Sequence, residues 1–290
     1  MKNTAVLLID CPDRKGLVAR VSGLLYEWGA NILHADQHRD QDLGLFFMRV
    51  EWELEPEDAA GSSGFDLSGF QHAFASLAAE LSMRWTLSDT RHKPRAAIFC
   101  SQYQHCVADL LDRWRAGELH CEIPLVISNH ADAAELARFY GVQFEHIPVT
   151  SATRNQAEAL QLQWLERRGI ELVVLARYMQ ILSSAFVSRY PAAIINVHHS
   201  FLPAFHGARP YHAAHARGVK LIGATSHYVT EKLDEGPIIE QDVTRISHRD
   251  QVENLVARGR DLERIVLSRA VRWHLDRRIL CYGNKTVIFD

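Results

Sequence analysis

Apolar and polar residues follow two recurring periods along the first 90 positions. Alternation of apolar and polar residues, as in Met48–Leu54, is typical of a half-buried strand, and apolar residues three and four apart, as in Leu17–Leu25, are typical of a helix. Asp13 is expected to cap the first helix. The expected elements are strands at 5–9, 31–38, 46–54 and 83–87, helices at 14–28 and 67–81, and a loop at 55–64.

This order, βαββαβ within 90 residues, is typical of a ferredoxin-like domain. The polar segment 89–94 lacks periodicity and is interpreted as a linker. From Arg95 onward short apolar runs alternate with helical patterns, which predicts βαβ units and a mostly parallel, Rossmann-like sheet. We therefore expect an α/β protein with a first domain at 1–88 and a second at 95–290.

Composition narrows the class of protein. The chain has 290 residues, a formal net charge of −3 and no dense run of Lys or Arg, which disfavours a nucleic-acid or anionic-membrane partner. The five cysteines form no C-x-x-C pair, which argues against a disulfide framework and a structural zinc site. With no apolar run near the ~18 residues of a membrane span, we expect a cytoplasmic protein.

The strongest candidate chemistry lies between Ile194 and Ile246. Asn196 and His198 are two apart in an apolar strand pattern, so both side chains project from the same face. Asp234 follows a second apolar strand. An amide and a protonated imidazole can donate to a developing oxyanion, while a carboxylate holds the imidazole charged and orders a nucleophile. Taken singly, each residue is also explained as a strand-end or turn residue.

The segments Asn196-Val-His198, Ser200-Phe-Leu-Pro203 and Asp234-x-Gly236-Pro-Ile-Ile resemble the active-site signature of the folate-dependent formyltransferases. The resemblance implies that Asn196, His198 and Asp234 handle the formyl group of 10-formyltetrahydrofolate. It also assigns folate binding to a set of residues after the strands, with His227 orienting the site: Arg177, Met179, Gln180, Ile181, Leu182, His227, Glu231 and Leu233. Met179, Ile181 and Leu182 are otherwise plain core residues.

Two departures from the family pattern affect the acceptor and the folate. The loop at 101–106 contains no glycine, so a cradle for a substrate phosphate is not expected there. Arg177 and Gln180 stand where the family commonly has glycine and arginine, which implies a different contact to the folate tail. The many histidines near His198 match no zinc spacing. We expect no metal and no cofactor.

The N-terminal segment Asp10–Val18 and the later Gly-Ala-Asn31-Ile32 resemble the ACT domain. This resemblance implies a homodimer or homotetramer in which paired copies bind an amino-acid effector, methionine or glycine, near Gly16, Leu17, Val18, Asn31 and Ile32. The alternative is that Gly16 and Asn31 are turn and cap residues and that the domain only dimerises.

Together the two modules resemble the formyltetrahydrofolate deformylases along nearly the whole chain. The resemblance implies that water accepts the formyl group and that formate and tetrahydrofolate feed one-carbon and purine metabolism. Two alternatives stay open: a formyltransferase that passes the group to an amine, and a non-catalytic module that responds to folate or an amino acid. A pure sensor would not need Asn196, His198 and Asp234 together.

Overall fold

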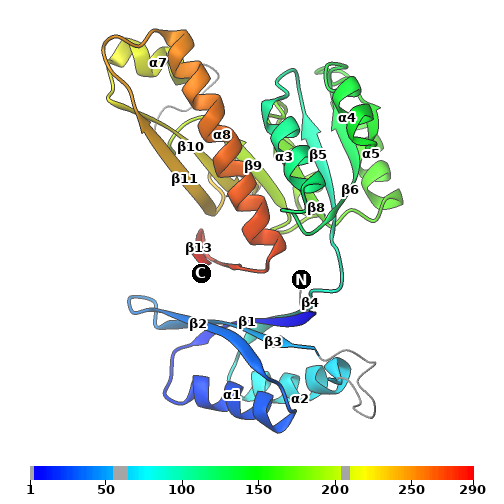
Figure 1. The fold of residues 1–290 in the computed structure, drawn as a ribbon, viewed down its shortest axis with the longest axis vertical. Helices are drawn as coiled ribbons and strands as arrows, with labels where there is room; N and C mark the ends of the chain where they lie inside the picture. The colour runs from blue at the N-terminus through cyan, green and yellow to red at the C-terminus, as the bar shows by residue number, and fades with distance from the viewer. Residues whose placement is uncertain (1–2, 55–64, 204–209) are drawn as a thin grey trace. The chain divides into compact units, whose positions relative to one another are not determined.

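The computed structural model describes residues 3–54, 65–203 and 210–290 and divides them between two compact units (Figure 1). The first unit holds the described residues up to Lys93 together with Arg277–Leu280 and Val287–Asp290. The second unit holds Pro94–Asp276 and Cys281–Thr286. The loop expected at 55–64 falls outside the described residues.

The first unit has the predicted βαββαβ order. Its four strands pair antiparallel in the order β2-β3-β1-β4, and both helices lie on one face of the sheet (Figure 1). Buried residues of the sheet and of both helices form one core between these layers. The elements are β1 (Thr4–Pro12), α1 (Leu17–Glu27), β2 (Ile32–Asp40), β3 (Leu45–Glu53), α2 (Leu67–Glu80) and β4 (Arg84–Asp89).

The first helix begins differently from what the sequence predicted. Gly16, at φ 91°, is the N-cap of α1, and no side chain caps the helix. Asp13 instead pairs with Arg39 at 2.5 Å, so the expectation that Asp13 caps this helix is wrong. A residue in the left-handed region is least strained as glycine, which explains why the helix begins after Gly16.

The second unit is built on a seven-stranded sheet in the order β11-β10-β9-β8-β5-β6-β7. The strands from β7 to β9 are parallel, and β10 and β11 extend the sheet antiparallel. The elements are β5 (Arg95–Cys100), α3 (His105–Arg115), β6 (Glu122–Ser128), α4 (Ala134–Tyr140), β7 (Gln143–His146), α5 (Arg154–Arg167), β8 (Leu172–Ala176), α6 (Ser184–Val187), β9 (Ile194–His198), α7 (Pro210–Arg217), β10 (Leu221–Tyr228), β11 (Ile238–Arg245) and α8 (Val252–Leu275).

Helices cover both faces of this sheet. Ala97 and Phe99 of β5 share a buried cluster with residues of α5 and α6. The long helix α8 lies along β9, β10 and β11 (Figure 1). The strands β12 (Ile279–Tyr282) and β13 (Lys285–Ile288) pair with each other near the C-terminus. The sequence did not predict α6, α7 or β11.

The strand order changes direction between β5 and β8, which are neighbours in the sheet although β6 and β7 separate them in the chain. In parallel sheets of this kind, ligands bind at the carboxyl ends of the strands beside such a change of direction. This arrangement therefore brings the segments after β5, β8 and β9 to one edge of the sheet.

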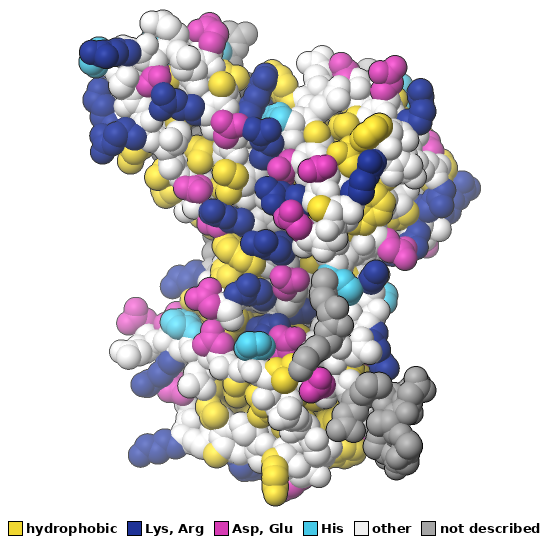
Figure 2. Space-filling model, in the orientation of Figure 1, with side chains coloured by type: hydrophobic (Ala, Val, Ile, Leu, Met, Phe, Trp, Pro, Cys, Tyr) yellow, Lys and Arg dark blue, Asp and Glu magenta, His cyan; other side chains and the backbone are white. Residues whose placement is uncertain are grey.

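On the face drawn in Figure 2, basic side chains lie among acidic ones, and the coloured residues there form no extended surface of a single charge. None of the helices that the structure describes combines the length and the hydropathy that crossing a bilayer requires.

Candidate active site

A cavity of about 390 Å³ opens at the carboxyl ends of β8 and β9. The structure brings together here every residue that the sequence assigned to catalysis or to folate binding. The cavity is lined by Leu175, Arg177, Tyr178, Met179, Gln180, Ile181, Leu182, Asn196, Val197, His198, His199, His227, Val229, Thr230, Glu231, Lys232, Leu233 and Asp234.

The predicted trio is assembled by β9 and by the loop after β10. Asn196 and His198 are two residues apart in β9, which places both side chains on the same side of the strand. Nδ1 of His198 lies 3.2 Å from Oδ2 of Asp234. The other ring nitrogen, Nε2, is buried and has no hydrogen-bond partner among the described residues. His198 therefore has one nitrogen on the carboxylate and one free for a ligand.

His227 fixes the orientation of the Asn196 amide. The two residues are paired across β9 and β10, and Nδ1 of His227 donates to the carbonyl oxygen of Tyr228 at 2.9 Å. In the neutral ring Nε2 is then an acceptor, and Nδ2 of Asn196 lies 3.2 Å from it. One amide N–H is thus occupied, and among the described residues the second N–H has no hydrogen-bond partner and is available for a ligand oxygen.

Asp234 is held as a carboxylate. Burial alone would raise its pKa, but the hydrogen bond from His198 and the neighbouring His227 ring outweigh burial and hold the pKa far below its usual range. Its backbone has φ 55°, in the left-handed region that few non-glycine residues adopt. Strain of this kind is common where the surrounding structure must aim a functional side chain.

Gly236 has a packing reason to be glycine. A Cβ at this position would collide with the carbonyl oxygen of Tyr228 and lie 3.2 Å from Cγ2 of Thr230. We expect Gly236→Ala to lower the free energy of unfolding by about 1–3 kcal/mol, as overpacking usually does, and to slow turnover by displacing Asp234. Urea unfolding measures the first effect.

The matched control is Gly23→Ala, because a Cβ on Gly23 meets no atom within 4 Å. Gly23 lies inside α1, where alanine should stabilise the helix by about 0.5–1 kcal/mol. Equal unfolding free energies for Gly236→Ala and the unchanged chain would contradict the packing argument.

The loop after β8 is tied to its surroundings at several points. Oγ of Ser101 accepts from the backbone N–H of Met179 at 3.0 Å, and Arg154 donates to the carbonyl oxygen of Ile181 at 2.6 Å. Met179, Ile181 and Leu233 nevertheless keep 47%, 56% and 61% of their surface exposed. Exposed apolar side chains lining one cavity on fixed backbone suit a flat ring system.

Comparison with known proteins agrees with this geometry. The formyl transferase family model matches residues 94–271, and the ACT domain model matches residues 5–57. A formyltetrahydrofolate deformylase of Synechocystis sp. is 52% identical over 99% of this chain and 98% of its own length. One of Bacillus subtilis is 49% identical over 98% of this chain and 93% of its own. The chain belongs to the formyltetrahydrofolate deformylase family.

Solved structures separate this family from its transferase relatives. The crystal structure of a formyltetrahydrofolate deformylase from Pseudomonas syringae pv. tomato has a TM-score of 0.94 and 48% identity, and covers 100% of this chain and 95% of that one. A glycinamide ribonucleotide transformylase from Symbiobacterium toebii has a TM-score of 0.66 and 32% identity, and covers 71% of this chain and 98% of that one. The deformylases therefore match both units of the chain.

A buried polar network that the sequence did not predict lies beside the cavity of this deformylase-family chain. Glu263 of α8 is 1% exposed and accepts from Oη of Tyr211 and from Nε2 of His105, each at 2.7 Å. Nη1 of Arg177 lies 3.5 Å from the same carboxylate. Burial opposes the charge of Glu263, but these partners lower its pKa overall. The sequence signal that could have indicated this network is the position of Glu263, a charged residue on the apolar side of its helix.

Thr225 was also missed by the sequence analysis. This buried β10 residue lies opposite His198, and its hydroxyl accepts from the backbone N–H of Leu202 at 3.0 Å and donates to the carbonyl oxygen of Ser200 at 2.9 Å. Thr225 therefore fixes the backbone that follows His198 and His199. No periodicity marks such a residue within an apolar strand.

His105, Cys106 and Glu263 are one group of described residues whose ligand atoms lie close enough to hold a metal ion, within 4.8 Å of one another. The surroundings do not suit a cation, because Arg177 and two hydrogen-bond donors already satisfy Glu263. Burial raises the pKa of the Cys106 thiol well above its usual value, so the thiolate that a metal prefers is disfavoured. The chemistry of this group is that of an ion-pair network.

His199 is buried beside His198, with ring centroids 5.1 Å apart. Burial, with the charges of Arg177 and His198, lowers the pKa of His199 from 6.5 to about 4. A histidine with a lowered folded-state pKa binds protons more readily in the unfolded chain. Its contribution to stability is therefore complete above pH 6.5 and is lost as the pH falls towards about 4.

We expect this loss to reach about 3 kcal/mol of unfolding free energy by pH 4. Urea unfolding of the unchanged chain and of His199→Gln between pH 7 and pH 4 measures it, because the variant should lose less stability over that range. His72→Gln, an exposed histidine on α2, is the matched control and should keep the pH dependence of the unchanged chain. A His199→Gln curve with unchanged slope would contradict the assignment.

The candidate effector residues of the ACT unit lie at two ends of one helix. Gly16, Leu17 and Val18 form the start of α1, and Asn31 and Ile32 follow its other end. A helix of 11 residues separates these ends by about 16 Å. One chain therefore does not bring the five residues together.

Proposed function

We propose that this chain hydrolyses 10-formyltetrahydrofolate to formate and tetrahydrofolate, with Asn196, His198 and Asp234 as the catalytic residues. The observation that carries the proposal is the meeting of these three side chains in one cavity, in a chain similar to named deformylases over nearly its whole length. Water is the acceptor of the formyl group.

The reaction begins with attack of water on the formyl carbon. Asp234 orders the water and accepts its proton, and the formyl oxygen becomes an anion. The free N–H of Asn196 and Nε2–H of a protonated His198 donate to that oxygen. The tetrahedral intermediate then collapses, the bond between the formyl carbon and N10 breaks, and N10 takes the proton that Asp234 accepted from water. The second proton of the water leaves to solvent when the formic acid ionises, so hydrolysis yields tetrahydrofolate, formate and one proton.

The folate is held by the loops on either side of the trio. Met179, Ile181 and Leu182 form one side of a slot for the pteridine ring, and Leu233 adds a further apolar surface. Gln180 and Glu231 supply polar groups at the same cavity. His227 acts by orienting Asn196 and Asp234.

The deciding experiment is formate release from 10-formyltetrahydrofolate by the purified protein with no amine acceptor, no added metal and a chelator present. Equal amounts of formate and tetrahydrofolate support the hydrolase and argue against a metal requirement. Transfer of the formyl group to an added amine, without release of formate, would instead establish a formyltransferase. Folate binding without either product would establish a sensor.

The first unit has a regulatory and dimerising role in this proposal. Residues 1–88 act as the ACT domain, 89–94 as the linker and 95–290 as the catalytic domain of a homodimer or homotetramer, except that Arg277–Leu280 and Val287–Asp290 belong to the first unit. Supporting observations are that β2 is an edge strand with most of its side chains exposed, and that the five effector residues lie at opposite ends of α1. Two copies are therefore needed to complete an amino-acid site.

Light scattering on the eluting protein measures the oligomer, and formate release with added glycine or methionine measures regulation. A response that Asn31→Ala abolishes while leaving the basal rate unchanged would support the amino-acid site. We place the reaction in the cytoplasm, where thiols stay reduced, because no disulfide joins the five cysteines. Its products enter one-carbon and purine metabolism.

A further inference from the structure

Three residues that line the catalytic cavity each carry a buried nitrogen with no hydrogen-bond partner among the described residues. These nitrogens are Nε of Arg177, Nε2 of His198 and Nε2 of His199, on side chains that are each at least nine-tenths buried. Leaving a buried donor unsatisfied costs about 1–3 kcal/mol, so such atoms commonly mark a place that a ligand or water fills. In the proposed mechanism Nε2 of His198 donates to the formyl oxygen. The nitrogens of Arg177 and His199 remain without an assigned role.

Arg177 is held in its position at the expense of backbone strain. Its φ of 63° lies in the left-handed region, which disfavours a long side chain, yet the residue directly follows β8 at the sheet edge. The guanidinium lies 5.3 Å from the centroid of the Tyr103 ring, and Nη1 faces Glu263. Strain of this kind persists where neighbouring contacts determine the position of the side chain.

The Glu263 carboxylate that anchors Arg177 is itself fixed. Tyr211 and His105 donate to its two oxygens, and α8 supplies a long, rigid backbone. Because these donors share its negative charge, Glu263 neutralises Arg177 only in part. The result is an oriented cation at the cavity wall with one N–H unpaired.

The proposed reaction creates a need for such a group. Hydrolysis adds a second oxygen to the formyl carbon, and both the tetrahedral intermediate and formate are anionic. Asn196 and His198 bind the original oxygen, whereas the new oxygen forms beside Asp234. Once Asp234 has passed its proton to N10 and formic acid has ionised, formate and the Asp234 carboxylate are two neighbouring negative charges, which repel each other unless a cation lies nearby.

We propose that Arg177 and His199 form a subsite for the oxygen that water contributes, and so bind product formate, with Glu263, Tyr211 and His105 positioning Arg177. The proposal rests on the proposed function and deepens it. The partial neutralisation by Glu263 keeps formate binding weak, which allows the product to leave.

The test is the binding of ¹³C-labelled sodium formate to the full chain, followed by NMR line broadening, so that the readout does not need activity. Arg177→Gln should weaken formate binding about 10-fold or more, the usual effect of losing a hydrogen bond to a charged group. The formate affinity of Arg177→Lys should lie between those of Arg177→Gln and the unchanged chain, since lysine keeps the charge but lacks the planar guanidinium.

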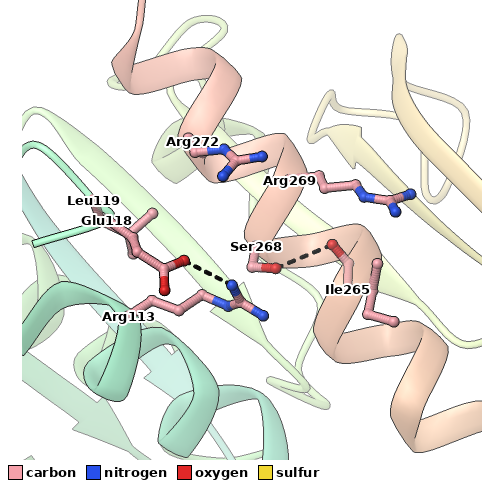
Figure 3. A pocket seen from close by; sticks show the side chains of 7 residues that line it. All are labelled: Arg113, Glu118, Leu119, Ile265, Ser268, Arg269 and Arg272. Carbon is pink, nitrogen blue, oxygen red and sulfur yellow. Dashed lines mark hydrogen bonds and ion pairs between the residues drawn. The ribbon is translucent and has the colours of Figure 1, made fainter. Parts of the chain in front are cut away.

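The matched control is Arg272→Gln, which removes the same charge from a different cavity. That cavity lies between α3 and α8, and Figure 3 shows Arg272 there beside Arg113 and Arg269, with Arg113 paired to Glu118. It shares no lining residue with the catalytic cavity. Arg272→Gln should bind formate within about 2-fold of the unchanged chain, because its charge lies outside the subsite.

Arg177→Gln leaves Glu263 buried without its cation, and such a change can prevent folding. The double variant Arg177→Gln/Glu263→Gln removes both buried charges, and Gln keeps the shape of Glu263, so it tests the subsite in a folded chain. In either variant the turnover number should fall about 10-fold or more, while KM for the folate changes less than about 2-fold.

Formate binding by the double variant that equals that of the unchanged chain would overturn the subsite. So would a rise in KM with an unchanged turnover number, which would assign Arg177 to the folate instead. If the unchanged chain releases no formate from 10-formyltetrahydrofolate, the proposed function fails. The labelled-formate measurement still separates that failure from the failure of the subsite, since it needs no turnover.

Discussion

Replacing Asp234 by alanine should lower the turnover number for formate release about 100-fold to 10,000-fold, the range for loss of a general base. The carboxylate lies 3.2 Å from Nδ1 of His198 and 3.5 Å from Nε2 of His227, so its loss also removes the carboxylate beside both rings. Asp234→Asn keeps the shape but loses the charge, and should lose as much activity. Single-turnover formate release measures the chemical step.

The pH dependence gives a second check on Asp234. Because its pKa is held far below the usual range, Asp234 stays ionised between pH 5 and pH 9. Any loss of rate in the unchanged chain towards pH 5 therefore comes from another group. Asp132→Ala, an exposed carboxylate outside the cavity, is the matched control. An Asp234→Ala variant with more than about a tenth of the normal turnover would remove Asp234 from the catalytic set.

Asn196→Ala and His198→Ala should each lower the turnover number about 100-fold to 1000-fold, the usual effect of losing one donor to an oxyanion. Nδ2 of Asn196 is oriented by His227, and Nε2 of His198 is buried and unpaired among the described residues. Both donors strengthen their bonds only as the formyl oxygen becomes negative. KM for the folate should therefore change little.

Asn155→Ala, which removes an exposed amide on α5, is the control for these two variants. The double variant Asn196→Ala/His198→Ala gives a sharper result. Two donors to the same oxyanion should show non-additive losses, as residues that act as a unit do. A large rise in KM with unchanged turnover would instead make Asn196 or His198 a ground-state folate contact.

The common orientation of Asn196 and His198 could be predicted from the sequence because it depends only on local strand geometry. Asn196 and His198 lie on one short strand, where a period of two fixes their common face. Asp234 could not be placed beside them by periodicity alone, since it follows a different strand. Its position came from the resemblance of the whole segment to a known signature.

The elements that were not predicted have weak patterns. The edge strand β11 reads Ile-Ile-Glu-Gln-Asp-Val-Thr-Arg and is largely exposed or half-buried, so neither alternation nor an apolar run marks it. Helix α7 has few apolar positions. In the Glu263 network, the partners of Glu263 are separated from it by 52, 86 and 158 positions in the sequence. No local sequence pattern indicates contacts over such separations.

The division of the chain between its two units predicts how the protein behaves when it is expressed as two separate polypeptides. Arg277–Leu280 and Val287–Asp290 belong to the first unit although they end the sequence, and Nε of Arg49 donates to the carbonyl oxygen of Arg277 at 3.0 Å. A polypeptide that stops at Lys93 would lack these segments. We expect two co-expressed halves, divided at the linker, to purify together, because the second half carries part of the first unit with it.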